Sequence, residues 1–302
     1  MSEVTTNSRN PLCVAGIPFI HNGATGFALP ERISPTWPGS RVTELPIRVH
    51  HAAGAAGSDG LRPLFEVPVP LGEYFLDGRE NVAIRSRAMG VPGFHPQLMR
   101  TDRSGFEYAI QYADPSESLK FQWAWHRTIF MLALPLRSRG LTIHAAGFLL
   151  PDGGAIACPG ISGAGKSTLA RTLQQHAPEA VRILSDDRIA VTLESEGLHA
   201  WGTPWYSSAE AAAAEDGRLT ALVFVAHGAG ARLVPLAPGV AMRRLLRTVG
   251  FPFWDQASTA FALEFVSRLV ADVPCFEFSY EPTPTAAVSL LDGIRLAFAS
   301  GD

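Results

Sequence analysis

The stretch GISGAGKS, residues 160–167, carries the strongest signal in this chain. It matches the phosphate-binding pattern GxxxxGK[ST] at every position. Glycines permit backbone conformations with positive φ that turn successive N–H groups toward an anion, and a following helix adds its N-terminal dipole. Lys166 would reach the β- and γ-phosphates of ATP, and the Ser167 hydroxyl would bind Mg²⁺. The predicted nucleotide-binding residues are Gly160, Ile161, Ser162, Gly163, Ala164, Gly165, Lys166, Ser167 and Thr168.

The residues on either side of this loop have the pattern that a phosphate loop requires. Ala155–Pro159 is a short apolar run that predicts a buried strand, and residues 166–176 place Leu169 and Leu173 on one face of a helix. Leu141–Leu150 predicts a preceding strand, which the turn Asp152-Gly153-Gly154 would join to Ala155–Pro159. A strand before the loop and a helix after it argue against a chance glycine-rich turn.

Two carboxylates follow the loop after one predicted helix and one predicted strand. Asp186 and Asp187 come directly after the strand predicted over Arg182–Ser185. Neighbouring side chains on an extended segment point to opposite sides, so one carboxylate can bind the metal while the other accepts a hydroxyl proton. His144, in the strand before the loop, is a further candidate, although a lone histidine in an apolar strand is more often a core residue.

The remainder of the chain predicts a β-rich N-terminal region, residues 1–118, and a phosphate-loop domain, residues 119–302. In the first region His51–Gly60 predicts a flexible loop. The second region opens with an amphipathic helix over 119–136. The other predicted strands are 64–69, 82–87, 106–112, 189–193, a pair formed by 219–225 and 231–236, and 275–280. The other predicted helices are 238–248 and 257–271.

Two further groups of residues are candidates for substrate contacts. Arg243, Arg244 and Arg247 lie on or beside one predicted helix, where they would reach phosphates or an acidic peptide, or form a solvated surface. Trp201 and Trp205 would form part of a substrate wall or pack in the core.

Composition and charge exclude several classes of protein. The 302 residues carry a net charge of −3 and no cluster of five or six basic residues, which argues against nucleic acid or an anionic membrane surface as a partner. The three cysteines are far apart and form no CxxC, so we expect buried thiols rather than disulfides or a zinc site. The longest apolar run, Ile129–Leu136, is too short to span a membrane, and the polar N-terminus predicts a cytoplasmic protein.

Three segments, IHAAGFLL, GGAIACPGISGAGKSTLA and RILSDDRIAV, resemble the catalytic domain of HPr kinase/phosphorylase in their order and spacing. They are more similar still to the HPr-kinase-like proteins found with peptide-modification clusters, including lasso-peptide serine kinases. The resemblance covers residues 141–193, and Gly202–Trp205 is also similar. It implies an α/β fold, the P-loop kinase core of the phosphoenolpyruvate-carboxykinase-like type, with a mixed sheet and flanking helices.

The chain departs from this family in two places. Ile161 stands where the family loop has an acidic residue. We find no convincing match to the downstream motif that the bifunctional enzymes use for phosphorolysis and oligomer contacts.

The resemblance also implies roles for individual residues. Asp186 would be the general base, His144 would contact that base, and Asp187 would assist Ser167 with Mg²⁺. The chain would then be an ATP-dependent kinase that phosphorylates a hydroxyl, with a Ser of a protein or peptide as the acceptor.

Three alternatives remain beside this one. They are a small-molecule kinase, a non-catalytic nucleotide-binding module that recruits a peptide or partner enzyme, and a transporter ATPase. The absence of an LSGGQ-type signature argues against the transporter ATPase.

Overall fold

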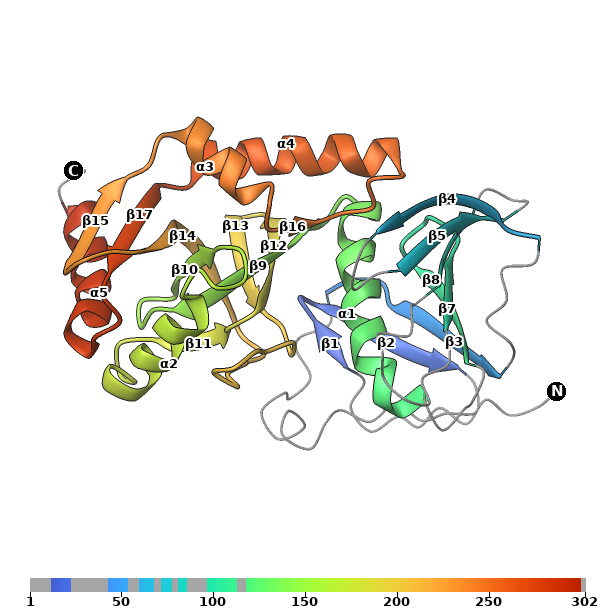
Figure 1. Cartoon of the computed structure of the whole chain (residues 1–302), viewed down its shortest axis with the longest axis horizontal. Helices are drawn as coiled ribbons and strands as arrows, with labels where there is room; N and C mark the ends of the chain where they lie inside the picture. The colour runs from blue at the N-terminus through green and yellow to red at the C-terminus, as the bar shows by residue number, and fades with distance from the viewer. Residues whose placement is uncertain are drawn as a thin grey trace. The chain divides into compact units, whose positions relative to one another are not determined.

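The computed structural model describes residues 12–22, 43–53, 60–67, 72–77, 81–85, 97–112 and 118–299 (Figure 1). The chain forms two compact units, and the boundary between them lies between Arg137 and Ser138. The structure is mixed α/β, with a mixed sheet in each unit and five helices in the ranges given above. None of these helices combines the length and apolar character that crossing a membrane requires.

The N-terminal unit contains an eight-stranded sheet in the order β1-β2-β3-β8-β7-β6-β5-β4. Strands β2, β3 and β8 run parallel to one another, and the other pairs are antiparallel. The strands are β1 (Cys13–Val14), β2 (Ile17–Asn22), β3 (Ile47–Ala53), β4 (Arg62–Val67), β5 (Gly72–Leu76), β6 (Val82–Arg85), β7 (Leu98–Thr101) and β8 (Glu107–Tyr112).

The prediction of a β-rich N-terminal region is therefore confirmed. The alternation seen in the sequence of β8 buries Tyr108, Ile110 and Tyr112 on one face, as a period of two requires. The flexible loop predicted over His51–Gly60 is wrong at its start, because His51–Ala53 pair with β8 as the end of β3. Residues 54–59 lie outside the described residues.

Helix α1 (Ser118–Leu136) belongs to the N-terminal unit rather than opening the second one. Its Trp125 indole donates a hydrogen bond to Gln97, and the Phe130 ring lies 6.3 Å from the ring of Phe19. Apolar spacing predicted this helix, but the spacing does not say which sheet the apolar face covers. The boundary between the two units therefore lies after α1, whereas we predicted a domain boundary before this helix, between residues 118 and 119.

A chain of three histidines, of which His51 and His126 are buried and His21 is partly buried, connects α1 to the sheet of this unit. His126 Nε2 lies 3.2 Å from His21 Nε2, and His21 Nδ1 lies 3.0 Å from His51 Nε2. His51 Nδ1 in turn lies 3.1 Å from the Tyr112 hydroxyl. Burial, together with the charges of neighbouring histidines, lowers the pKa of His21 to about 2 and that of His51 to about 4. These imidazoles are consequently neutral at pH 7.

The second unit contains a nine-stranded sheet in which β10-β9-β12-β13-β14-β17-β15 form the main path. β11 and β16 pair with β9, and β10 also pairs with β14. β14 is parallel to β10 and β17, and the other pairs are antiparallel. The strands are β9 (Gly140–Leu149), β10 (Gly154–Pro159), β11 (Arg182–Ser185), β12 (Arg188–Glu194), β13 (Gly197–Gly202), β14 (Asp216–His227), β15 (Ala231–Pro235), β16 (Val249–Gly250) and β17 (Cys275–Tyr280).

One predicted pairing in this sheet is wrong. The sequence predicted a strand pair from residues 219–225 and 231–236, but β17 lies between β14 and β15. β17 is parallel to β14 and antiparallel to β15. A short connection favours a hairpin in sequence, whereas the observed order places the buried apolar residues of β17 between two other strands and leaves β15 at the edge of the sheet.

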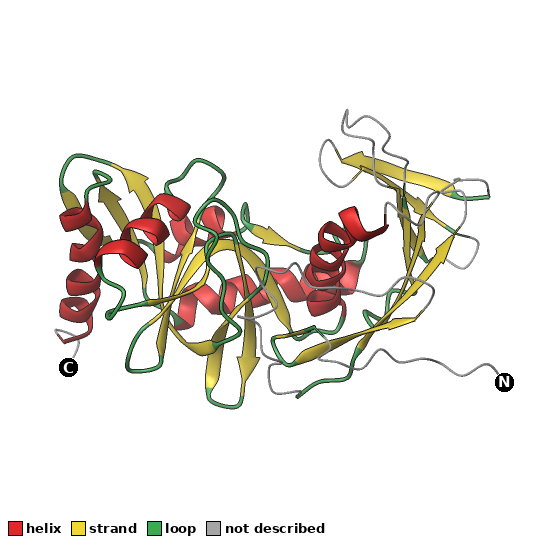
Figure 2. Cartoon of the chain, turned by 90° about the horizontal axis from the view of Figure 1, so that it is seen from below, coloured by secondary structure: helices red, strands yellow, loops and turns green. Residues whose placement is uncertain are grey.

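Helices cover both faces of the second sheet (Figure 2). Ile156 and Cys158 of β10 pack with α2 (Lys166–His176) and α5 (Pro284–Ala299). The alternate residues Ala155 and Ala157 pack on the other face, where the core includes residues of α3 (Pro238–Leu245) and α4 (Gln256–Asp272). A strand covered on both faces is apolar throughout, which explains the composition of β10.

The three cysteines are buried free thiols, as predicted. Burial raises the pKa of Cys13 and of Cys275 to about 11, so both are protonated at neutral pH.

Candidate functional site

The glycine loop connects the end of β10 to the start of α2, which confirms the predicted strand–loop–helix arrangement. Gly163 and Gly165 have φ values of 83° and 95°, a region that side-chain-bearing residues rarely adopt. Gly165 is the N-cap of α2, so the first N–H groups of the helix face the space that the loop encloses. The loop therefore has the local backbone geometry of an anion-binding nest.

Lys166 is only 4% exposed, and its Nζ donates a hydrogen bond to the Ile161 carbonyl oxygen at 3.0 Å. Burial lowers the pKa of Lys166, and the carboxylate of Asp187 opposes that shift. The ammonium group is thus held across the loop, where an incoming phosphate would replace the carbonyl as its partner.

Two side chains that the sequence did not single out support the loop. His227 Nε2 lies 3.3 Å from the Gly163 carbonyl oxygen, and the Tyr280 hydroxyl donates to the Gly165 carbonyl oxygen at 3.4 Å. His227 and Tyr280 are opposite each other at the ends of the parallel strands β14 and β17. Residues at the carboxyl ends of parallel strands surround ligand sites in α/β sheets. The position of His227 and Tyr280 at the ends of two predicted strands was therefore the sequence signal that could have identified them.

Asp186 is fully buried, and backbone groups occupy both of its carboxylate oxygens. The backbone N–H groups of Ser207 and Ala209 each donate to one of these oxygens, both at 2.8 Å. Asp186 therefore holds the segment after β13 against the end of β11. In addition, the Ser167 hydroxyl donates to the Asp186 carbonyl oxygen at 3.2 Å, which connects this turn to the glycine loop.

Asp186 and Asp187 form the bend between β11 and β12 rather than the extended segment that was predicted, and Asp187 has other partners than Asp186. Its Oδ1 lies 3.2 Å from His144 Nε2, and the two side chains are 17% and 21% exposed. The family resemblance predicts a contact between His144 and Asp186, whereas the structure pairs His144 with Asp187. The reason is register, because Arg188 is opposite His144 in the β9–β12 ladder, and the Asp187 carbonyl oxygen accepts from the Ala145 N–H.

The backbone of His144 is the point at which three segments of the chain meet. Its carbonyl oxygen accepts a hydrogen bond from the Gly160 N–H at 3.1 Å, and its N–H donates to the Thr248 carbonyl oxygen at 2.8 Å. The glycine loop, the turn with Asp187 and the segment that follows α3 are thereby fixed around one residue of β9.

The donor set beside the loop is compatible with Mg²⁺. No group of three or more His, Cys, Asp or Glu side chains in the described part of the chain is arranged to hold a metal. Mg²⁺ beside a nucleotide does not require such a group, because phosphate oxygens and water complete its shell. The Ser167 hydroxyl and the partly exposed Asp187 carboxylate offer the hard oxygen ligands that it prefers.

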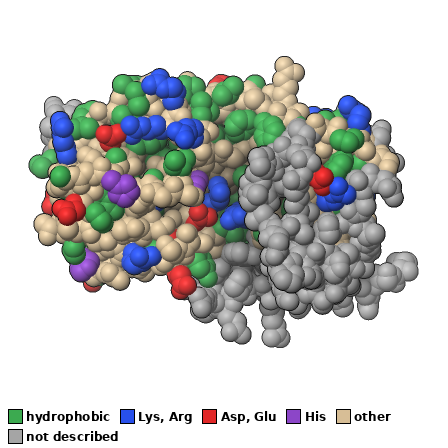
Figure 3. Space-filling view, in the orientation of Figure 1, with side chains coloured by type: hydrophobic (Ala, Val, Ile, Leu, Met, Phe, Trp, Pro, Cys, Tyr) green, Lys and Arg blue, Asp and Glu red, His purple; other side chains and the backbone are tan. Residues whose placement is uncertain are grey.

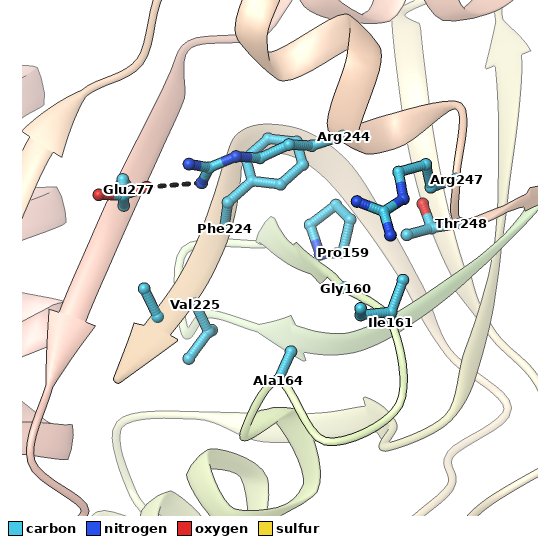
Figure 4. A pocket seen from close by; sticks show the side chains of 11 residues that line it. Pro159, Gly160, Ile161, Ala164, Phe224, Val225, Arg244, Arg247, Thr248 and Glu277 are labelled. Carbon is cyan, nitrogen blue, oxygen red and sulfur yellow. Dashed lines mark ion pairs between the residues drawn. The ribbon is translucent and has the colours of Figure 1, made fainter. Parts of the chain in front are cut away.

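A pocket of about 250 Å³ lies between the glycine loop and the segment of α3 and the residues that follow it (Figure 4). Arg244 Nη1 forms an ion pair with Glu277 Oε2 at 2.6 Å, and the Arg244 guanidinium carbon lies 6.0 Å from the centre of the Phe224 ring. In the space-filling view, Lys and Arg side chains gather over α3 (Figure 3). The lining residues are Pro159, Gly160, Ile161, Ala164, Phe224, Val225, Ala226, Arg244, Arg247, Thr248 and Glu277.

The remaining candidates lie elsewhere. Arg243 is exposed and does not line this pocket, whereas Arg244 and Arg247 both line it. Trp205 is 2% exposed and packs in the core, and the Trp201 indole donates to the Thr192 hydroxyl at 2.7 Å. Trp205 therefore forms no substrate wall.

A scan against models of protein families finds no match to the chain, and a search among curated proteins finds none either. The functional interpretation consequently rests on the residues of the site.

Proposed function

We propose that this chain is an ATP-dependent kinase with a P-loop kinase core, which transfers the γ-phosphate of ATP to a hydroxyl group. The observation that supports this proposal best is the position of the Asp187–His144 pair. His144 belongs to β9, and its carbonyl oxygen accepts a hydrogen bond from the Gly160 N–H at the start of the glycine loop. The next residue of β9, Ala145, donates its N–H to the Asp187 carbonyl oxygen, and the two side chains form the ion pair. A phosphate nest beside an oriented carboxylate suits transfer to an acceptor better than nucleotide binding alone.

In this proposal the loop N–H groups and Lys166 bind the phosphates, and Ser167 holds Mg²⁺ together with phosphate oxygens and water. When bound, the metal neutralises charge on the β- and γ-phosphates. Lys166 is already buried, so its charge acts in a site from which water is largely excluded, where electrostatic stabilisation is strong.

We assign the role of base to Asp187 rather than to Asp186. The acceptor hydroxyl oxygen forms a bond to the γ-phosphorus while its proton passes to the Asp187 carboxylate, and the bond to the β–γ bridging oxygen breaks to release ADP. His144 orients the carboxylate through Oδ1. Asp186 is less suited to accept a proton, because two backbone N–H groups already bind its oxygens.

The test is incubation with [γ-³²P]ATP, Mg²⁺ and a library of Ser-containing peptides and small hydroxy compounds. We expect label on an acceptor with the wild-type protein, a loss of about 10²- to 10⁴-fold in rate for Asp187→Asn, and unchanged rates for Asp292→Asn, an exposed aspartate on α5. The Asp187 carboxylate could also hold Mg²⁺, but the proposal gives it the role of base instead, so raising the Mg²⁺ concentration should not restore transfer by Asp187→Asn.

Two results would count against the proposal. Transfer at the wild-type rate by Asp187→Asn would remove this residue from the chemistry. Tight ATP binding without label on any acceptor would favour the non-catalytic nucleotide-binding module.

A further inference from the structure

The pocket in Figure 4 lies beside the phosphate nest and shares Gly160, Ile161 and Ala164 of the glycine loop with it. The nest is at the N-terminus of α2, which packs on one face. The pocket is walled by Phe224 and Arg244, and Phe224 belongs to the core of the face that carries α3 and α4. Gly160 and Ile161 form the floor of the pocket and the first part of the loop. Gly163, Gly165, Lys166 and Ser167 do not line the pocket, so phosphates bound by these residues would leave it open for a second ligand.

The charges in the pocket sum to one positive charge. Arg244 and Glu277 form a close ion pair and cancel each other. Arg247 is exposed at the pocket, and its guanidinium group forms no hydrogen bond or ion pair with any residue that the structure describes. A single uncompensated guanidinium presents a planar set of donors that matches one carboxylate.

The Arg247 end of the pocket is connected to the proposed base through His144. Thr248, the next residue, also lines the pocket, and its carbonyl oxygen accepts from the His144 N–H at 2.8 Å. His144 holds Asp187 through its side chain. The middle of the pocket is apolar, with Pro159, Phe224 and Val225 in its walls.

We infer that this pocket binds the phosphate acceptor and that Arg247 selects acceptors carrying a carboxylate close to the hydroxyl. The inference rests on the proposed kinase function and narrows its substrate class. The hydroxyl lies toward Asp187, the carboxylate pairs with Arg247, and an apolar part of the acceptor contacts Phe224 and Pro159. A peptide with an acidic group next to its Ser and a small hydroxy acid share this chemistry.

The experiment uses three matched pairs of acceptors that differ only in the carboxylate. They are N-acetyl-leucyl-serine as free acid and as amide, the amides of Leu-Ser-Glu and Leu-Ser-Gln, and glycerate and glycerol. Their binding to the full-length protein loaded with Mg²⁺ and a non-hydrolysable ATP analogue is measured by calorimetry, and their phosphorylation is measured with ATP. The variants are Arg247→Met and, as a matched control, Arg232→Met, which removes an exposed arginine on β15.

We expect the carboxylate member of at least one pair to bind and react about 10- to 100-fold better, as a charge-assisted hydrogen bond supplies. Arg247→Met should abolish that preference through KM while leaving ATP affinity unchanged, and Arg232→Met should retain it. The responding pair identifies the source of the carboxylate, whether a peptide terminus, a peptide side chain or a hydroxy acid.

Each other outcome refutes the selection of acceptors by Arg247, the proposed kinase function, or both. Transfer without a carboxylate preference, or an equal fall for both members of a pair in Arg247→Met, refutes selection by Arg247 and leaves the kinase standing. Loss of ATP affinity in Arg247→Met assigns the arginine to the nucleotide. A carboxylate preference in binding without any transfer retains the subsite and refutes the kinase, and neither binding nor transfer refutes both.

Discussion

The two adjacent aspartates should respond to the same substitution in opposite ways. Asp186→Asn replaces a buried carboxylate that accepts two backbone hydrogen bonds with an amide that has one acceptor oxygen. The amide NH₂ group then faces the N–H of Ser207 or Ala209, and one buried donor loses its partner. A hydrogen bond to a charged group contributes about 1.5–3 kcal/mol, so we expect a loss of about 2–4 kcal/mol in the free energy of unfolding. For a unit of this size that lowers the Tm by about 5–15 °C.

Asp187→Asn is the matched comparison, because this side chain is partly exposed and its neighbours, His144 at 3.2 Å and Arg188 at 3.8 Å, are partly exposed as well. We expect the Tm of this variant to stay within about 3 °C of the wild type, while phosphoryl transfer falls as described above. Thermal unfolding by circular dichroism and the labelled-ATP assay, run on both variants, separate the two roles. If Asp186→Asn unfolds like the wild type, binds ATP and transfers no phosphate, then Asp186 is the base and the assignment to Asp187 is wrong.

Three further predictions concern the loop and the histidine chain. Lys166→Met should weaken ATP binding by about 10- to 100-fold in equilibrium titration, because a buried charge contact is lost. Gly165→Ala should destabilise the protein by about 1–2 kcal/mol and also weaken ATP binding, whereas Gly153→Ala, which also has positive φ but lies in an outer turn, should only destabilise it. The free energy of unfolding should fall by up to about 1.4 kcal/mol per pH unit for His51 as pH drops from about 6.5 toward 4, because the folded state keeps this imidazole neutral and the unfolded state protonates it. In urea titrations His51→Gln should flatten this dependence, and His176→Gln, on the exposed side of α2, should not.

Each of these has an outcome that contradicts it. ATP affinity unchanged in Lys166→Met would mean that the ammonium group stays on the Ile161 carbonyl when nucleotide binds. Equal effects of Gly165→Ala and Gly153→Ala on ATP binding would show that ATP affinity does not depend on the conformation of the glycine loop. A pH dependence that is the same in His51→Gln would place the titrating group elsewhere.

Local sequence was enough to predict the elements that surround the loop. The strand over 154–159, the positive-φ glycines and the helix over 166–176 all follow from residues close together in the chain. Hydrophobic spacing and turn chemistry act over a few residues, so their outcome depends little on the remainder of the protein. The different partners of Asp186 and Asp187 do not follow from strand alternation, because the two residues form a bend between β11 and β12.

Tertiary structure decided which of these groups meet. Whether His144 pairs with Asp186 or Asp187 depends on the register between β9 and β12, and the place of β17 between β14 and β15 depends on burial of its apolar residues. The sequence analysis did not predict helix α5 (Pro284–Ala299) or strand β13 (Gly197–Gly202). Neither segment carries a distinct local signal.

The same distinction applies to charge. Arg243, Arg244 and Arg247 are equivalent in sequence, as basic residues on or beside one helix. Only the fold compensates Arg244 with Glu277, leaves Arg243 exposed outside the pocket, and places Arg247 at the pocket mouth beside the segment bound to His144. Residue types and spacing thus determined that the chain has a glycine loop between a strand and a helix, with two carboxylates nearby. Contacts between residues distant in sequence determined their partners, because burial and compensation of charge are properties of the assembled core and not of any short segment.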